Sequence, residues 1–532
     1  MALKYLYAPI GYEGGKAYGV LPNVANADLS FTRASGATKV IGSSNKTIDK
    51  GESLGPNIES TDFSSGWTGV GSGMTLSTGA AVWNKSGAYI QTDSNITLGK
   101  KYRIIIEVTS FTSATSGGLY YYSGNGGTKL SVNGVGTYEY TFTSDETRKF
   151  VLNSYTGTFL TVGSVSLKEI TTTNLNTPRL DYTDYTFPTL LVEPERTNIH
   201  KYSEKISSWN FNPSNWGGTI TENAEISPDG SQNADLISII TQSGVYMPTM
   251  SVTQGTVYST SVYAKHISGT SILKFALTAR FHSGGGTSEK GIFVDLSDGS
   301  ITSNTIGSAA NVKVIDVGNG WYRLCIQNHV AGETGNVNVT FYGQNTTSME
   351  YSLWGAQVEV GKYTSSYIPT YPPAISTRSA DTGVISGDLS SYINSTEGVL
   401  EIRAKALFNG GDSVRIALSD GSHTNRINLI WSSNSNTLHV GMVANNLFVF
   451  DGGTAFFKSF THDQTQMATF KIKWKSGDIQ VKVNDVVVLT ETHTFTILGL
   501  DQVRLDAGYG TQTELFEGNV QYIKVYDSAN DF

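Results

Sequence analysis

Apolar and polar residues alternate along many short stretches of this chain. The stretches include residues 102–108, 257–265, 337–342, 470–475 and 478–483. A period of two places successive side chains on opposite faces of a β-strand, so each stretch predicts a strand with one buried and one solvated face. No helix of three clean turns is evident. Short strands of this kind bury one face by packing sheet on sheet, and the sequence therefore predicts an all-β protein of tandem β-sandwich or jelly-roll domains.

Pairs of residues that tolerate positive φ separate the predicted strands. They are Asn-Gly at 125, 133 and 319 and Asp-Gly at 229, 298, 420 and 451, which suit tight hairpins. Glycine accounts for 57 of the 532 residues, and the 28 Tyr, 22 Phe and 8 Trp are too many for a disordered polypeptide. A chain of this length predicts several domains, each with its own core.

The charge of the chain narrows the choice of partners. Its 37 basic and 45 acidic side chains give a net charge of -8, and no five like charges follow one another. Because the charges are sparse and scattered, the sequence argues against binding to nucleic acid or to an anionic membrane. A neutral polar partner fits better. No apolar stretch approaches the roughly 18 residues that cross a bilayer, so we expect no membrane insertion.

The start of the chain and its single cysteine indicate where the protein is made. Residues 1–16 lack a basic end followed by an apolar core, so no export signal is expected. Cys325 alone excludes an intramolecular disulfide and a thiolate metal cluster. Both features predict synthesis and folding in a reducing cytosol.

A weak internal repeat predicts the domain boundaries. A Thr-x-Gly-x-x-Tyr motif opens an alternating strand at 97–102 and again at 253–258, each time after an Asn-Ile pair and a tryptophan. Either two strand-rich segments share this pattern by chance, or they are related β-sandwiches, at 57–170 and 198–370. Residues 171–197 and 371–384 are then linkers, and 385–532 is a third unit. Residues 1–56 fall outside all three and predict an irregular, adaptable segment.

Six segments resemble bacteriophage virion fibre and tail proteins. Residues 28–40 (Asp-Leu-Ser-Phe-Thr-Arg-Ala-Ser-Gly-Ala-Thr-Lys-Val), 177–182 (Thr-Pro-Arg-Leu-Asp-Tyr) and 188–198 (Pro-Thr-Leu-Leu-Val-Glu-Pro-Glu-Arg-Thr-Asn) are similar to the two halves of a signature of those proteins. Residues 352–361, 366–370 and 377–381 are similar to the end of their carbohydrate-binding-module-like domain. About 136 residues separate the halves of the signature, as if the first sandwich were inserted between them.

The third unit resembles a concanavalin-A-like (LamG-type) jelly roll, with residues 478–488 as a hairpin and 518–527 as the closing strand. These resemblances imply a virion structural protein whose N-terminal region docks to the particle and contacts other virion proteins. They also imply carbohydrate-binding-module-like sandwiches at 57–170 and 198–370 that bind host surface glycans. Jelly-roll families contain binders, hydrolases and structural proteins, so fold alone does not settle activity.

Motifs for catalysis are missing from the chain. It has no His-Glu-x-x-His, Gly-x-Ser-x-Gly, phosphate-binding loop or dinucleotide fingerprint. A glycosidase needs two facing carboxyl groups, and Glu401, Glu514 and Glu517 remain possible, although solvated carboxylates are commoner. We therefore expect no enzyme activity, no catalytic residue, no cofactor and no metal site. A capsule polysaccharide depolymerase is the least favoured alternative.

Sugar binding requires fewer precisely placed groups than catalysis. It needs an aromatic ring that stacks on the apolar face of a pyranose and polar groups that hydrogen-bond to its hydroxyls. The predicted ligand-binding residues are Tyr121, Tyr246, Tyr263, Tyr342, Trp354, Gln357, Trp431, His439, Asp451 and Tyr509. Core packing is the alternative for each ring. Because the triplet at 120–122 must send at least one tyrosine to solvent from a strand, Tyr121 or a neighbour is expected to form a contact patch.

The sequence thus predicts a fibre or fibre-like appendage of a bacteriophage virion that binds host cell-surface carbohydrate. A purely structural head-fibre, decoration or tail-associated protein without sugar binding is the alternative. Weak single sites imply a homo-oligomer, with a trimer favoured and a dimer open. The expected location is the virion, after synthesis in the host cytoplasm.

Overall fold

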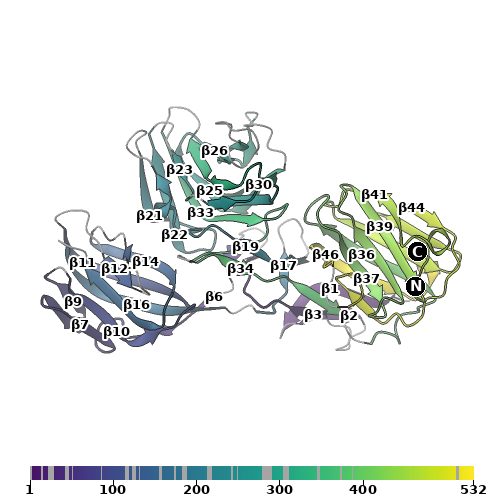
Figure 1. Ribbon diagram of the computed structural model, residues 1–532, viewed down its shortest axis with the longest axis horizontal. Coiled ribbons are helices and arrows are strands. Elements are labelled where there is room, and N and C mark those ends of the chain that lie inside the picture. The colour runs from purple at the N-terminus through teal and green to yellow at the C-terminus, as the bar shows by residue number, and fades with distance from the viewer. Residues whose placement is uncertain are drawn as a thin grey trace.

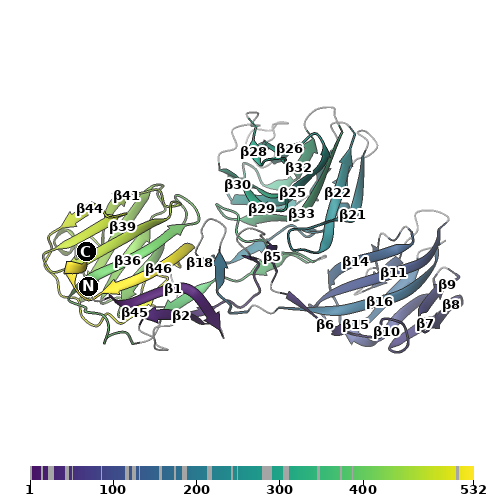
Figure 2. The same cartoon turned by 180° about the vertical axis from the view of Figure 1, so that it is seen from behind.

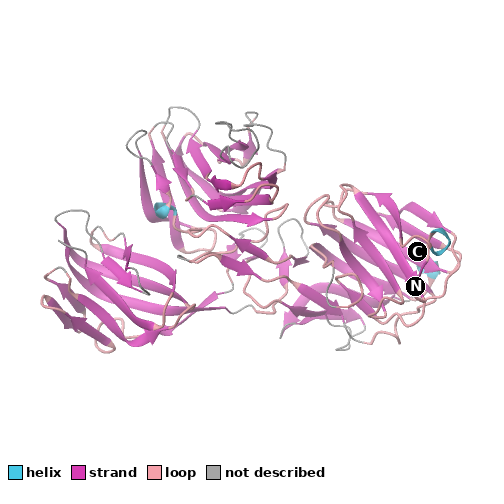
Figure 3. Cartoon of the chain, in the orientation of Figure 1, coloured by secondary structure: helices cyan, strands magenta, loops and turns pink. Residues whose placement is uncertain are grey.

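The computed structural model describes residues 3–532 except 14–15, 22–28, 42–46, 51, 86, 114–118, 123–126, 131, 133, 155–157, 173–174, 182–187, 212–217, 241–243, 249, 278–289, 303–310, 344–347, 372–373, 386–387 and 511–513. The described part is built of strands, and its helices are three-residue 3₁₀ turns, η2 (Ile206–Ser208), η4 (Asp451–Gly453) and η5 (Ala529–Asp531) (Figure 3). The expected all-β class is confirmed. No helix in this part is long and apolar enough to cross a membrane.

Three β lobes make up the molecule (Figure 1). The first lobe is a two-layer sandwich. One layer contains β7 (Trp67–Val70), β10 (Tyr89–Ile96), β15 (Arg148–Ser154), β12 (Leu119–Tyr122) and β13 (Gly127–Leu130). The other contains β8 (Met74–Ser77), β9 (Ala80–Trp83), β16 (Thr158–Thr172), β11 (Lys101–Ser113) and β14 (Gly136–Thr143), and β6 (Glu52–Asn57) joins it beside β16. All described pairings in this lobe are antiparallel, and Trp83, Ile104 and Phe142 lie in its core.

The second lobe repeats this two-layer plan. One layer contains β20 (Asn210–Phe211), β23 (Gly244–Tyr246), β32 (Val339–Gly343), β26 (Ile272–Leu277), β27 (Lys290–Asp295) and β28 (Ser300–Ile301). The other contains β21 (Gly218–Ile226), β22 (Gln232–Ile239), β33 (Met349–Val360), β25 (Val257–Gly269), β30 (Trp321–Val330) and β29 (Val312–Gly318). The short pairs are β24 (Met250–Val252) with β31 (Gly335–Val337), β4 (Lys39–Ile41) with β5 (Thr47–Asp49), and β19 (Arg196–Asn198) with β34 (Ser376–Arg378).

The third lobe is a jelly roll that draws strands from three distant parts of the chain. Its C-terminal strands are β35 (Thr382–Ile385), β36 (Glu397–Ala406), β37 (Val414–Ser419), β38 (Arg426–Trp431), β39 (Thr437–Ala444), β40 (Leu447–Phe448), β41 (Phe457–Thr461), β42 (Ala468–Lys475), β43 (Ile479–Val483), β44 (Val486–Glu491), β45 (Gln502–Arg504) and β46 (Gly518–Tyr526). The earlier strands are β1 (Leu3–Glu13), β2 (Lys16–Leu21), β3 (Leu29–Thr32), β17 (Arg179–Asp181) and β18 (Thr189–Val192). One layer runs β45-β37-β38-β39-β41, and the other runs β1-β46-β36-β42-β43-β44.

The N-terminal strand belongs to this jelly roll, which corrects the prediction of an irregular segment outside the three lobes. β1 pairs with β46 antiparallel, with Leu3 opposite Tyr526 and Tyr7 opposite Ile523 (Figure 2). Tyr5 and Tyr7 are 0% and 1% exposed in the same core as Val525. The two tyrosines occupy alternate positions of β1, and Lys4 and Leu6 on either side of Tyr5 are half-buried.

The chain leaves the third lobe for the first sandwich and returns beside its point of departure. β6 pairs with the end of β16, with Glu52 opposite Thr172. The backbone N–H of Arg33 donates to Asn176 Oδ1 at 2.9 Å, and the N–H of Asn176 donates to the Arg33 carbonyl at 3.2 Å. The two halves of the signature therefore meet in space although the first sandwich separates them in sequence, as an insertion requires.

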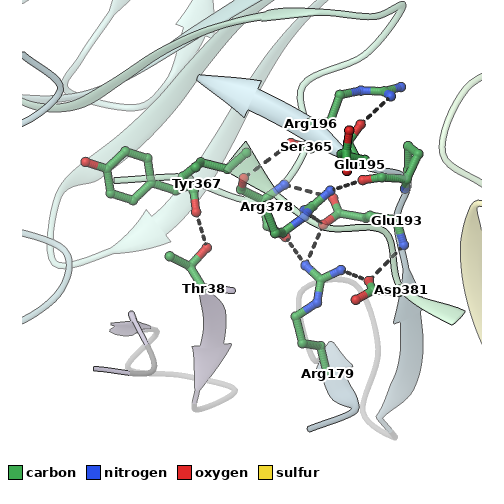
Figure 4. Close-up of polar contacts among 12 residues, drawn as sticks. Thr38, Arg179, Glu193, Glu195, Arg196, Ser365, Tyr367, Arg378 and Asp381 are labelled. Carbon is green, nitrogen blue, oxygen red and sulfur yellow. Dashed lines mark hydrogen bonds and ion pairs between the residues drawn. The ribbon is translucent and has the colours of Figure 1, made fainter. Parts of the chain in front are cut away.

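Five charged side chains from these halves and from residues 377–381 form a buried cluster, termed the hub: Arg33, Arg179, Glu193, Arg378 and Asp381. Figure 4 shows the last four. Arg179 contacts both carboxylates, Arg378 contacts Glu193, and Arg33 Nη1 lies 3.0 Å from Asp381 Oδ1. Each arginine of the hub thus touches at least one carboxylate.

The hub joins the second lobe to the third. Glu193 Oε1 accepts the backbone N–H of Ser366 at 2.8 Å, and Asp381 Oδ2 accepts the N–H of Glu193 at 3.0 Å. The predicted linkers 171–197 and 371–384 contain β17, β18, β34 and β35, all of which pair with other strands. They are not free connectors, because the hub and these pairings hold them in place.

Candidate functional site

Five of the predicted sugar-binding residues lie in hydrophobic cores, which corrects that part of the prediction. The exposed fraction is 0% for Trp354 and Gln357, 1% for Trp431, 3% for Tyr263 and 5% for Tyr121. A ring this enclosed offers no face to a pyranose. In this structure these residues are packed in the protein interior, as the alternative prediction of core packing stated.

Trp354, Tyr263 and Gln357 hold the second lobe together. Tyr263 on β25 is opposite Trp354 on β33, and the two ring centroids are 5.3 Å apart. Gln357 accepts the N–H of Ile368 at 2.7 Å and donates to Glu359 at 2.7 Å, so its amide ties the segment after β33 back to that strand. The sequence pattern of β33 could not distinguish this internal role of Gln357 from ligand binding, because either role places an amide beside aromatic rings.

Tyr121 packs in the first lobe, 4.7 Å from Phe142 between ring centroids. It also borders a cavity of about 540 Å³ between the first and second lobes. The charges that line this cavity are partly compensated, since Lys50 Nζ lies 2.8 Å from Glu204 and 2.7 Å from Asp229. Burial, and to a smaller extent the nearby Glu222, raise the pKa of Asp235 on its wall to about 7, although three backbone N–H groups oppose the rise.

Two predicted residues lie on one sheet of the second lobe. Tyr246 is half-buried on β23, and Tyr342 is on the neighbouring strand β32. The side chain of Tyr342 is outside the described residues. The structure therefore places their strands side by side without showing a shared platform.

Trp431 and Asp451 of the third lobe do not share a surface with His439. Trp431 packs against Phe516 in the core, with ring centroids 4.8 Å apart. Asp451 is exposed next to β41, and its carboxylate is 2.6 Å from Lys458 Nζ, which also lies 3.5 Å from Glu491 of β44. Asp451 thus forms its ion pair with Lys458 at the edge of the jelly roll where β41 of one layer contacts β44 of the other.

His439 and Tyr509 lie on a common surface of the third lobe, because the core takes the alternate residues of β37, β38 and β39, such as Ile416, Leu429 and Val440. The intervening residues point to the opposite face. Together with neighbouring side chains they form what we term the arginine–aromatic face: Arg415, Arg426, Asn428, His439, Phe456, Phe457 and Tyr509.

Rings line one end of this face. His439 lies 4.2 Å from Phe457 between ring centroids, and Phe456 lies 6.2 Å from Phe457 and nearly perpendicular to it. Phe457 is 45% exposed, so one of its faces is open to solvent. Gly441 of β39 allows this packing, since a Cβ there would come within 2.8 Å of the Phe456 ring. The result is an exposed aromatic platform of the kind that sugar stacking requires.

Two arginines stand beside the platform. The Arg415 guanidinium is 5.3 Å from the Phe456 ring centroid, and that of Arg426 is 5.3 Å from Phe456 and 4.7 Å from Tyr509. Arg415 Nη2 lies 2.7 Å from the Glu514 carboxylate. In the described residues, Arg426 has no carboxylate within ion-pair distance, and its hydrogen bond runs from Nη1 to the His423 carbonyl at 2.7 Å. The Nε–H groups of both arginines are buried without a partner in this part of the chain.

A buried amide lies beneath the platform. Asn428 is 0% exposed, and neither its Oδ1 nor its Nδ2 has a hydrogen-bond partner among the described residues. Its neighbours across the sheet are Ala417 and Gly441, so small residues flank it on both sides. An unpaired buried amide costs about 1–3 kcal/mol, and native proteins carry few of them. Because unpaired buried polar atoms occur in all three lobes of the described part, the candidate site rests on the exposed ring of Phe457 and the arginines beside it rather than on the amide.

The histidine of this face is a neutral hydrogen-bonding group. Burial, and then the charge of Arg415, lower the pKa of His439 below its ordinary value. Its Nδ1 lies 2.8 Å from the Ser459 hydroxyl, which fixes the ring beside Phe457. At neutral pH the positive charge of the face therefore comes from the arginines.

Sequence reasoning found His439 and Tyr509 but missed Arg415, Arg426, Asn428, Phe456 and Phe457. Alternation along β38, with Ile427 and Leu429 apolar, was the available signal for Arg426 and Asn428. The two phenylalanines follow a turn, and only the folded hairpin brings them over Gly441. The described residues contain no group of three His, Cys, Asp or Glu that could hold a metal ion.

Comparisons with known proteins leave the family of this chain open. No protein-family description and no curated protein matches it. Among solved structures, the chain is similar to the N-terminal CBM22-1–CBM22-2 tandem domain of Xyn10C from Paenibacillus barcinonensis, at 9% identity and a TM-score of 0.19, over 62% of this chain and 100% of that one. A likeness this low carries no argument about a ligand.

Proposed function

We propose that this protein is a structural fibre or fibre-like appendage of a bacteriophage virion that binds host surface glycans without catalysis. The resemblance of residues 28–40, 177–198 and 377–381 to virion fibre and tail proteins supports the virion role. Residues of these segments build the hub, so the segments that carry the resemblance are also those that join the lobes.

One observation carries the glycan-binding part of the proposal: an exposed aromatic platform lies beside two arginines. Rings carry the apolar face of a sugar, while guanidinium groups offer donors to its hydroxyls. We place the site on the arginine–aromatic face. Several copies of the chain would raise the avidity of such a site, and a trimer or a dimer serves this equally.

Attachment to the particle through the N-terminal region is part of the same proposal, in an altered form. Since β1 is a strand of the third lobe, the contact would use the part of that lobe where β1 pairs with β2 and with β46. A purely structural role is the second candidate function for the first two lobes, because Tyr121, Tyr263 and Trp354 are buried in the cores of these lobes.

A glycan array with the purified full-length chain tests the binding proposal. We expect a reproducible sugar signal that falls by about tenfold or more in Phe457→Ala, as loss of an aromatic anchor predicts. The matched control is Phe159→Ala, because Phe159 of the first lobe is 42% exposed, close to the 45% of Phe457. Absence of any signal, or equal losses in both variants, would contradict the proposal.

A further inference from the structure

Arg415 and Arg426 place two positive charges on the arginine–aromatic face, although the whole chain has a net charge of -8. The Glu514 carboxylate pairs with Arg415, and no carboxylate of the described residues lies within ion-pair distance of Arg426. Arg426 is only 7% exposed, and burial lowers its pKa, although the nearby Tyr509, Asp420 and Glu514 partly oppose this. A desolvated cation that contacts no carboxylate is unfavourable, so an anionic partner would be bound with an electrostatic gain.

The donors of this face fit a carboxylate better than a hydroxyl. Guanidinium groups present N–H donors in a planar fork that matches the two oxygens of a carboxylate. In the described residues Arg426 keeps Nη2 without a hydrogen bond, while its Nη1 is held by the His423 carbonyl and its Nε is buried. The contact with His423 and the stacking of Tyr509 at 4.7 Å hold the group in place before a ligand arrives.

We propose that the glycan bound by the arginine–aromatic face is an acidic one, in which the carboxylate of a uronic-acid-type sugar meets Arg426 and Arg415 while the sugar ring lies on Phe457. This inference rests on the proposed function and specifies its ligand class. It replaces the neutral partner expected from the composition of the chain, because two arginines stand at the site.

Glu514 competes with the ligand for Arg415. Its carboxylate lies 2.7 Å from Arg415 Nη2, and its side chain is 34% exposed, so it occupies the position that a ligand carboxylate would share. Two substitutions therefore have opposite expected effects. Arg426→Gln removes the unpaired cation, and Glu514→Gln removes the internal competitor.

The experiment measures binding of the full-length chain to polygalacturonate oligosaccharides and to the same oligosaccharides with their carboxyl groups reduced to alcohols. We expect the acidic probe to bind at least about tenfold more tightly, with the preference weakening as salt is raised. Arg426→Gln should lose most of this preference, and Glu514→Gln should increase affinity for the acidic probe about two- to tenfold.

Three controls separate folding and general charge effects from recognition. Arg426→Lys keeps the charge but lacks the planar fork, so it should fold and show an intermediate preference. Arg403→Gln in the other layer, where Arg403 Nε already donates to Gln521 at 2.6 Å, should leave binding unchanged. Thermal unfolding of each variant shows that it is folded.

The outcomes distinguish the two proposals. Equal binding of acidic and reduced probes would overturn the acidic-ligand inference while leaving glycan binding intact. Binding of neither probe, together with an empty glycan array, would remove the proposed function itself. Equal binding of dextran sulfate or single-stranded DNA, or an undiminished preference in Arg426→Gln, would also overturn the inference, since it would show general or distant anion binding.

Discussion

The hub and the arginine–aromatic face both contain arginines that are partly or fully buried, but they differ in how many of these arginines contact a carboxylate. In the hub, each of Arg33, Arg179 and Arg378 contacts Glu193 or Asp381. On the face, Arg426 has a carbonyl and two rings for neighbours and no carboxylate in the described residues. An arginine that contacts a carboxylate joins segments of the fold, whereas in our proposal an arginine without such a contact binds an external partner.

The same contrast holds for amides. Asn519 of β46 is 2% exposed and donates to Asp181 and Thr189, each at 2.9 Å. Asn428 is 0% exposed and has no partner among the described residues. One amide joins two segments of the third lobe, and the other costs free energy until a ligand or a water meets it.

The largest expected effect concerns the hub. Glu193→Gln removes the carboxylate that Arg179 and Arg378 share, and breaking a buried ion pair costs about 3–5 kcal/mol. Urea denaturation should show this loss in the free energy of unfolding. Glu195→Gln is the matched control, because Glu195 is exposed two residues away and its substitution should change stability by less than about 0.5 kcal/mol. Similar losses in both variants would mean that the hub does not stabilise the protein.

Acid should weaken the hub. Burial alone would raise the pKa of Glu193, but Arg378 and Arg179 lower it well below its usual value. A depressed folded pKa contributes stability above the unfolded pKa and loses it as the pH falls through the folded one. The urea midpoint of the wild type should therefore drop below about pH 4, where unfolded Glu begins to bind protons.

Glu193→Gln provides the control for this acid effect, because glutamine does not titrate in that range. Its urea midpoint should change less between pH 7 and pH 3 than that of the wild type. Parallel pH profiles for the two proteins would show that other carboxylates account for the loss.

A smaller effect of opposite sign is expected at the amide of the face. Asn428→Leu replaces an unpartnered amide with an apolar group of similar size, so stability should stay equal or rise by about 1 kcal/mol while glycan binding falls. Asn519→Leu should instead lose stability, since it leaves its partners Asp181 and Thr189 unsatisfied. Denaturation and glycan binding measured side by side check both statements, and a clear loss of stability in Asn428→Leu would contradict the absence of a partner for this amide in the described residues.

Much of the fold could be predicted because a β-strand has a local sequence pattern, the alternation of apolar and polar residues. Alternation along 470–475 placed Phe470, Ile472 and Trp474 in the core, and all three are 0% exposed. Alternation could not tell which buried face also meets a ligand, so Trp354 and Trp431 were assigned to sugar binding and lie in cores. The arginines of the face were missed because a single charged residue on a strand has the same pattern whether it is paired or free.

By itself, the sequence determined that this chain is all-β, since a period of two, frequent Asn-Gly and Asp-Gly turns and the lack of helical periodicity are local properties. Tertiary structure alone decided that Tyr5 and Tyr7 complete a jelly roll formed mostly by residues beyond 380, and that Arg33 meets Asp381. It also decided that Arg426 stands among rings without a carboxylate. Pairing between strands and between charges depends on which distant segments meet, and a linear pattern does not contain that information.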